Sequence, residues 1–198
     1  GNTTQQMIDR FTPSVLNYHP GGVVILGGIN DVSGLAGATT AAAIAGRLAT
    51  MADTAIAAGI QVVMCSILPL GVARTPTAAQ VQMILDTNGF IKSYVGSHAG
   101  VRYADYFTRM VGPDGLLPSD LSLDGLHPNA KGYSIMLPIT ENAITPPQPS
   151  LPGCTVTEPV AGSNRSPVWK HETRSPWIEH PSGPSWHFAP PASTTVTQ

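Results

Sequence analysis

The sequence is poor in cysteine, in charged residues and in long apolar runs, and each shortage excludes a class of protein. Two cysteines, Cys65 and Cys154, are too few for a disulfide framework. Charged residues make up 11% of the 198, and a net charge of −2 provides no basic surface for nucleic acid or an anionic membrane. No apolar run reaches the ~20 residues that span a bilayer. We therefore expect a soluble protein with a small, uncharged substrate. Its compartment stays open, with secreted and periplasmic among the alternatives.

Apolar segments alternate with helical patterns over the first three quarters of the chain. Residues 21–28 and 60–67 are short apolar runs typical of strands buried on both faces, and residues 101–105 are predicted to form a third short strand. Helices are predicted from Thr3, whose spacing to Gln6 is that of a capping box, and over 39–58, 77–97 and 129–144. Strands that alternate with helices predict an α/β fold with a parallel sheet and flanking helices.

The composition changes at residue 146. From there the chain is rich in Pro, Ser and Thr, shows little periodicity and contains all three tryptophans, at 169, 177 and 186. We predict one domain over 1–145 and an irregular Pro/Ser/Thr/Trp-rich tail over 146–198. An extension without a core is one interpretation of this tail. The other is that its β-branched segments pair with a sheet edge or with a second copy.

Asp124-Gly-Leu-His127-Pro is the sharpest local motif. A carboxylate three residues before an imidazole can accept a hydrogen bond from Nδ1–H, fix the tautomer and leave Nε2 free as a general base. The motif alone also fits a loop in which Asp124 caps a helix and His127 is a surface residue.

Asn30 follows directly on the first predicted strand, in Gly28-Ile-Asn-Asp. The carboxyl ends of parallel strands form the rim that faces ligands, so an amide at this position can donate to a developing oxyanion. An Asx turn that closes the strand is equally compatible with these residues.

Three blocks, Gly1-Asn-Thr-Thr, Gly28-Ile-Asn-Asp and Asp124-Gly-Leu-His-Pro, resemble in order and spacing successive blocks of the SGNH/GDSL hydrolases. The resemblance covers about residues 1–145. It implies a flavodoxin-like sheet and a carboxylester hydrolase, esterase- or lipase-like, that cleaves short acyl or aryl esters by acyl transfer. His127 would be the base, Asp124 its orienting partner, and Asn30 and Gly1 the oxyanion donors. No cofactor and no metal are implied.

The sequence departs from the family in one respect: it contains no Gly-Asp-Ser block, which holds the nucleophile upstream of the position that matches Gly1. We expect the family's N-terminal strands to be missing from this chain and the strand at 23–27 to form an exposed apolar edge. Ser33 is the first candidate for a stand-in nucleophile. The alternatives are hydrolysis by water that His127 activates, or a catalytically impaired remnant that binds ligands or forms a homodimer through the sheet edge or the tail.

Overall fold

The computed structural model describes residues 1–145 and, farther along the chain, the backbone of two short strands. By its contacts the chain divides into two units, Gly1–Gln148 and Pro149–Gln198, which we describe separately. In the second unit, β4 (Trp177–Glu179) pairs antiparallel with β5 (Trp186–Phe188). The sequence did not predict this pair. The other residues of the predicted tail, and with them Cys154, lie outside the described part.

The first unit is built on a parallel sheet. Its strands β1 (Gly22–Ile25), β2 (Gln61–Cys65) and β3 (Arg102–Ala104) lie in the order β1-β2-β3. Val24 of β1 is paired with Val63 of β2, and Val63 with Arg102. The predicted α/β class with a parallel sheet is confirmed.

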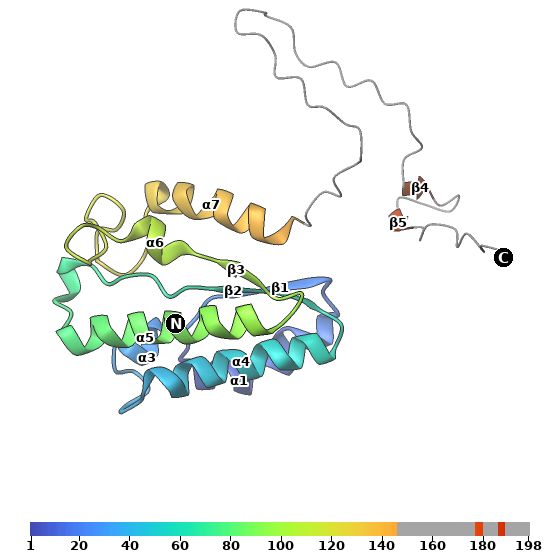
Figure 1. The fold of residues 1–198 in the computed structure, drawn as a ribbon, viewed down its shortest axis with the longest axis horizontal. Helices are drawn as coiled ribbons and strands as arrows, with labels where there is room; N and C mark the ends of the chain where they lie inside the picture. Colours follow the sequence, from blue (N-terminus) through green and yellow to red (C-terminus); the bar gives the residue numbers. More distant parts are fainter. Residues whose placement is uncertain (146–176, 180–185, 189–198) are drawn as a thin grey trace, which may run out of the picture. The chain divides into compact units, whose positions relative to one another are not determined.

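Helices cover both faces of this sheet (Figure 1). On one side lie α1 (Thr4–Asp9), α4 (Ala41–Ala57) and α5 (Ala78–Ser97), and on the other α6 (Tyr106–Met110) and α7 (Ala130–Ile144). Short elements complete the unit: α2 (Phe11–Ser14), a 3-10 turn at Leu16–Tyr18, α3 (Ile29–Val32) and a 3-10 turn at Val72–Arg74. None of the helices within the described residues is long and apolar enough to cross a membrane.

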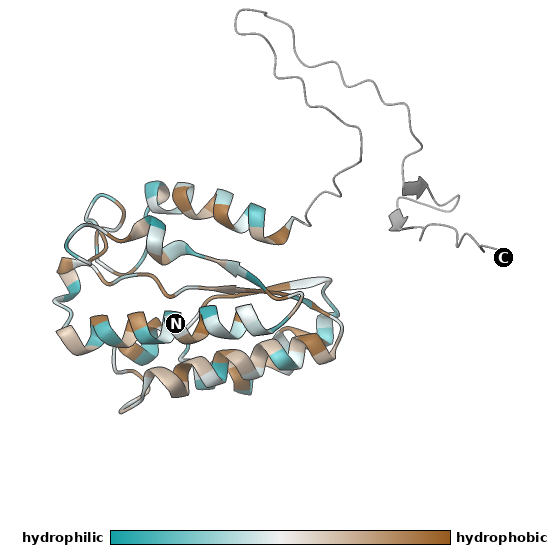
Figure 2. Cartoon of the chain, viewed as in Figure 1, coloured by the Kyte–Doolittle hydropathy of each residue, from teal (hydrophilic) through white to brown (hydrophobic). Residues whose placement is uncertain are grey.

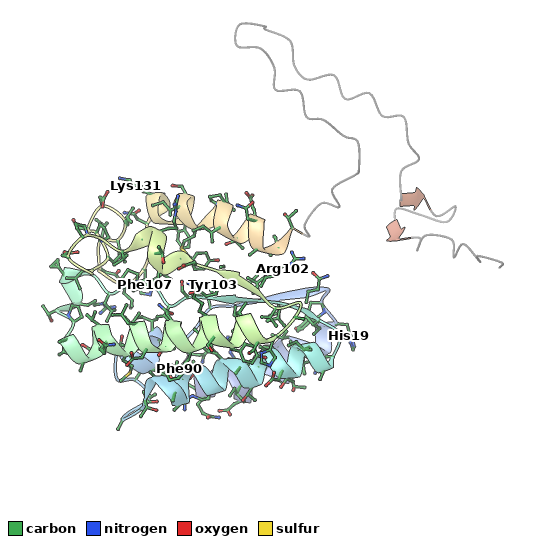
Figure 3. The ribbon with its side chains drawn as sticks, viewed as in Figure 1. His19, Phe90, Arg102, Tyr103, Phe107 and Lys131 are labelled. Atoms are coloured by element: carbon green, nitrogen blue, oxygen red, sulfur yellow. The ribbon has the colours of Figure 1, made fainter. Side chains whose placement is uncertain are left out.

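Local sequence signals set the ends of the main helices. Thr3 begins α1 with the predicted capping box, since its side chain accepts from the backbone N–H of Gln6 while Gln6 bonds back to the Thr3 N–H. Thr40 and Asn129 cap α4 and α7 in the same chemical way. A residue of the sheet caps the last turn of α7. Arg102 on β3 (Figure 3) donates to the carbonyls of Ala143 and Thr145, at 3.0 and 2.7 Å.

Two buried clusters form the core, one on each face of the sheet. In Figure 2 the central strand β2 is coloured as mostly apolar, and four of its five residues are buried between the helical layers. Ile44 and Leu48 of α4 pack with Val62 and Met64 of β2 on one face. On the other face Val63 and Cys65 pack with residues of α6 and α7. Because β2 contributes to both clusters, it is the strand that is buried on both faces.

The expectation that β1 is likewise buried on both faces is wrong. Val24 is 43% exposed, and Leu26 just beyond the strand is 40% exposed. β1 is an edge strand, and no described residue pairs with its outer side. Tyr133, Leu137 and Ile144 on α7 are also half exposed, at helical spacing. The predicted apolar edge is therefore present, together with an apolar stripe on α7.

Cys65 is expected to resist alkylation in the folded protein. Burial raises the pKa of its thiol to about 11, against a smaller lowering by a hydrogen bond with Tyr106. The nucleophilic thiolate is therefore scarce at pH 8. Peptide-resolved mass spectrometry after iodoacetamide treatment should find Cys65 unmodified in buffer and fully modified in urea. Comparable labelling in both conditions would contradict the buried position.

Candidate active site

The loop before α7 holds Asp124 against His127 in the arrangement that the motif predicted. Asp124 Oδ2 lies 2.6 Å from His127 Nδ1. Its other oxygen, Oδ1, accepts from the backbone N–H groups of Leu126 and His127, at 2.9 and 2.8 Å, and from the hydroxyl of Ser122 at 3.1 Å. One carboxylate thus folds the loop and orients the imidazole at the same time.

These bonds also keep the Asp124 carboxylate charged and set the tautomer of the neutral imidazole. The backbone N–H of His127, then its ring and the N–H of Leu126, hold the pKa of Asp124 well below its usual range. An ionised carboxylate can only accept hydrogen bonds, so Nδ1 must carry the proton on that side. Nε2 of His127, whose side chain is 75% exposed, is left with its lone pair whenever the ring is neutral.

A close backbone contact supports this loop from the segment that continues β2. The N–H of Gly71 donates to the carbonyl of Gly125 at 2.8 Å. A Cβ at Gly71 would lie 2.7 Å from the Cα of Gly125, and Gly125 has a φ of +68°, so neither position accommodates a side chain without a shift. Apart from the two glycines, no sequence pattern indicated this contact.

Asn30 and Gly1, the predicted oxyanion donors, lie side by side. Asn30 stands in α3, and its Nδ2 donates to the carbonyl of Asn2 at 2.9 Å. A Cβ built on Gly1 would lie 2.5 Å from Asn30 Nδ2, which shows how closely the two residues approach. An amide nitrogen carries two N–H groups, so one remains for a ligand after the bond to Asn2.

A buried ion pair holds together the segment that follows Gly1 and the segment that contains Asn30. Asp31, whose side chain has no solvent exposure, accepts from the backbone N–H and the hydroxyl of Thr4, at 2.8 and 2.6 Å. Arg47 of α4 donates to Asp31 at 3.0 Å and to the Thr4 hydroxyl at 2.6 Å. The residues after Gly1 and Asn30 are thereby joined by direct bonds, which sets the position of both donors.

One cavity of about 420 Å³ brings the predicted residues together. Gly1, Asn30 and His127 all line it. So do residues that the sequence analysis did not single out, namely Met7, Arg10, Leu26, Tyr133 and Met136. The alternatives of a capping Asp with an isolated surface His, and of an Asx turn at Asn30, do not account for this convergence. Met7 could have been found from its place on the apolar face of the predicted first helix.

Ser33 is not among the residues that line this cavity. It is the C-cap of α3, where its backbone N–H donates to the carbonyls of Asp31 and Ile29. Its use as a stand-in nucleophile stays a prediction that needs a direct test.

Comparison with known proteins identifies the family of this chain. Residues 1–135 match the GDSL-like lipase/acylhydrolase family, a match that covers more than half of the chain. The chain belongs to this family. The blocks at Gly1, Asn30 and Asp124 all fall within the residues that match the GDSL-like hydrolases.

Solved structures resemble this GDSL-like chain over most of the first unit. A GDSL-like lipase from Bacteroides thetaiotaomicron is 33% identical, with a TM-score of 0.66 over 72% of this chain and 70% of that one. A protein described as an acylhydrolase from Bacteroides fragilis is 29% identical, with a TM-score of 0.66 over 72% and 69%. An acetyl-xylooligosaccharide esterase from Geobacillus, at 15% identity and a TM-score of 0.61 over 74% and 69%, shares the fold. No curated protein matches the chain.

Proposed function

We propose that this GDSL-like chain provides the acid–base and oxyanion half of a carboxylester hydrolase that acts on short acyl or aryl esters. The observation that carries the proposal is the 2.6 Å contact of Asp124 with His127, on a cavity that Gly1 and Asn30 also line. Apolar residues such as Leu26, Leu68 and Met136 complete the lining and suit a short acyl or aryl group.

The chemistry is acyl transfer to a serine and then to water. A serine Oγ attacks the ester carbonyl carbon while His127 Nε2 takes its proton, and the carbonyl electrons move to an oxygen that Asn30 Nδ2–H and the Gly1 nitrogen stabilise. The carbonyl re-forms, the bond to the alcohol oxygen breaks, and His127 protonates the departing alcohol. Water repeats these steps on the acyl-serine and releases the acid.

The serine is proposed to lie outside residues 1–198, on a strand that pairs with the outer side of β1. Val24 and Leu26 leave this edge apolar and open, and Leu26, just after the strand, lines the cavity with His127. The carboxyl end of a parallel strand added at β1 would reach the same rim. A nucleophile at that end would then have the imidazole within reach.

The exposed edge of β1 and the stripe on α7 also favour a second candidate function. A chain that lacks the nucleophile could bind esters without cleaving them, or pair with a second copy through these surfaces. This alternative predicts a concentration-dependent dimer, and no turnover above that of a His127→Ala variant.

Mass spectrometry of the purified protein with and without a fluorophosphonate tests the source of the nucleophile. We expect the active sample to contain a further polypeptide segment, and the label to reach a serine on that segment in wild type and in Ser33→Ala alike. Label on Ser33 would instead identify it as the nucleophile.

Two results would overturn the serine mechanism. Turnover that is lost in His127→Ala but leaves every serine unlabelled would point to water activated directly by His127. Absence of turnover in every preparation, with or without an added segment, would leave the binding and self-assembly alternative.

A further inference from the structure

The cavity has an unbalanced charge, although the chain as a whole is slightly acidic. Arg10 is the only side chain with a permanent charge among the residues that line it, and none of the lining residues is Asp or Glu. Asp9, its neighbour in sequence, instead accepts a hydrogen bond from Gln5 at 2.9 Å. Arg10 is exposed, and a cation without a carboxylate partner beside a cleft attracts an anionic ligand.

Hydrogen bonds tie Arg10 to the residues that carry the predicted oxyanion donors. Its Nε donates to Asn2 Oδ1 at 3.1 Å, and the carbonyl of the same Asn2 accepts from Asn30 Nδ2 at 2.9 Å. The Nη1 and Nη2 groups donate to no described residue. Only Nε of the guanidinium is thus engaged by the protein, and Nη1 and Nη2 remain available to a ligand. These two groups can bind both oxygens of a carboxylate through parallel hydrogen bonds.

Apolar side chains lie beside Arg10. Met7, one turn earlier, and Leu26, after β1, line the same cavity. A short hydrocarbon segment can occupy this apolar part while a terminal anion meets the guanidinium. One permanent positive charge matches a singly charged carboxylate better than a dianionic phosphate.

We propose that Arg10 makes this site selective for esters that carry one free carboxylate, such as monoesters of short dicarboxylic acids. The inference rests on the proposed ester-binding function and narrows its substrate class. It differs from the expectation of an uncharged substrate, which was drawn from the net charge of the whole chain and not from the charge at one cavity.

Binding of two inert amide analogues tests the proposal without any need for the nucleophile. N-methylsuccinamate and N-methylbutyramide have almost the same size and differ by one carboxylate. In NMR titrations that follow the amides of Gly28, Asn30 and His127, we expect wild type to bind the succinamate about 10-fold more tightly, which is a typical gain for a charged hydrogen-bonded contact. The preference should weaken as salt rises from about 20 to about 200 mM.

Three variants assign the preference to Arg10. Arg10→Gln should bind both amides equally. Arg10→Lys, which keeps the positive charge but loses the pair of parallel N–H donors, should retain part of the preference. Arg109→Gln is the matched control, because Arg109 is an exposed arginine that does not line this cavity. We expect it to behave as wild type, and circular dichroism verifies that each variant is folded.

Two outcomes would overturn the proposal. One is equal binding of the two amides by wild type, and the other is a preference that survives in Arg10→Gln, which would show that Arg10 is not its source. Because binding is measured without turnover, a chain that shows the preference but hydrolyses no ester contradicts only the hydrolase proposal.

Discussion

Replacing His127 by alanine is expected to reduce p-nitrophenyl acetate hydrolysis at least about 10³-fold in any preparation that is active. The imidazole both takes the proton from the nucleophile and returns it to the leaving alcohol, and no other histidine lines the cavity. Because the His127 side chain is 75% exposed, its removal leaves no core void, so the unfolding midpoint should stay within about 1 °C of wild type.

His19→Asn is the matched control for this variant. His19 is exposed, lies at the opposite end of the unit from Lys131 at the start of α7 (Figure 3), and has a φ of 48° that asparagine tolerates well. We expect its activity to be unchanged. Equal rates for His127→Ala and wild type would contradict the assignment of His127 as the base.

Asp31→Ala is expected to be the most destabilising change, at about 3–5 kcal/mol in the free energy of unfolding. Removal of this carboxylate leaves the Arg47 guanidinium and the Thr4 backbone N–H without the acceptor that they share. The cost is large because the site is closed: Asp31 has no exposed side-chain surface, and Arg47 is 22% exposed. Urea denaturation followed by circular dichroism measures the difference.

Asp120→Ala is the comparison for Asp31→Ala. Asp120 also forms an ion pair, with Lys131 at 2.6 Å, but both side chains are more than half exposed. Loss of an exposed pair changes stability by about 0–1 kcal/mol. A similar loss in the free energy of unfolding for both variants would contradict the conclusion that the network around Asp31 holds the segments of Gly1 and Asn30 together.

The features that the sequence predicted well are those encoded within a few residues. The capping box of Thr3 and Gln6 and the bond of Asp124 to His127 each join residues three apart, so their spacing alone indicates the geometry. The two apolar runs and the short segment at 101–105 likewise predicted the three strands of the first unit. The convergence of Gly1, Asn30 and His127 was predicted through resemblance to the family, because no local pattern joins residues so distant along the chain.

Features that depend on tertiary contacts were missed. The bond of Arg47 to Thr4 joins residues 43 positions apart, and neither residue stands out in its own segment. From its composition alone, β1 was predicted to be buried on both faces, since composition does not say whether a neighbouring strand is present. Only the resemblance to the family predicted its exposed edge. Arg10 stands at the end of the first helix, and nothing in its own segment indicates that it lines a cavity.

The contact between Gly71 and Gly125 has a consequence for motion. A surface loop ordinarily opens on its own at little cost in free energy. Here the loop with His127 is pinned by its backbone to the segment that leaves the central strand, with no side chain between them to act as a hinge or a spacer. We therefore expect the imidazole to take its position when the sheet folds, before a substrate binds. The position of His127 thus depends on the folding of the central strand.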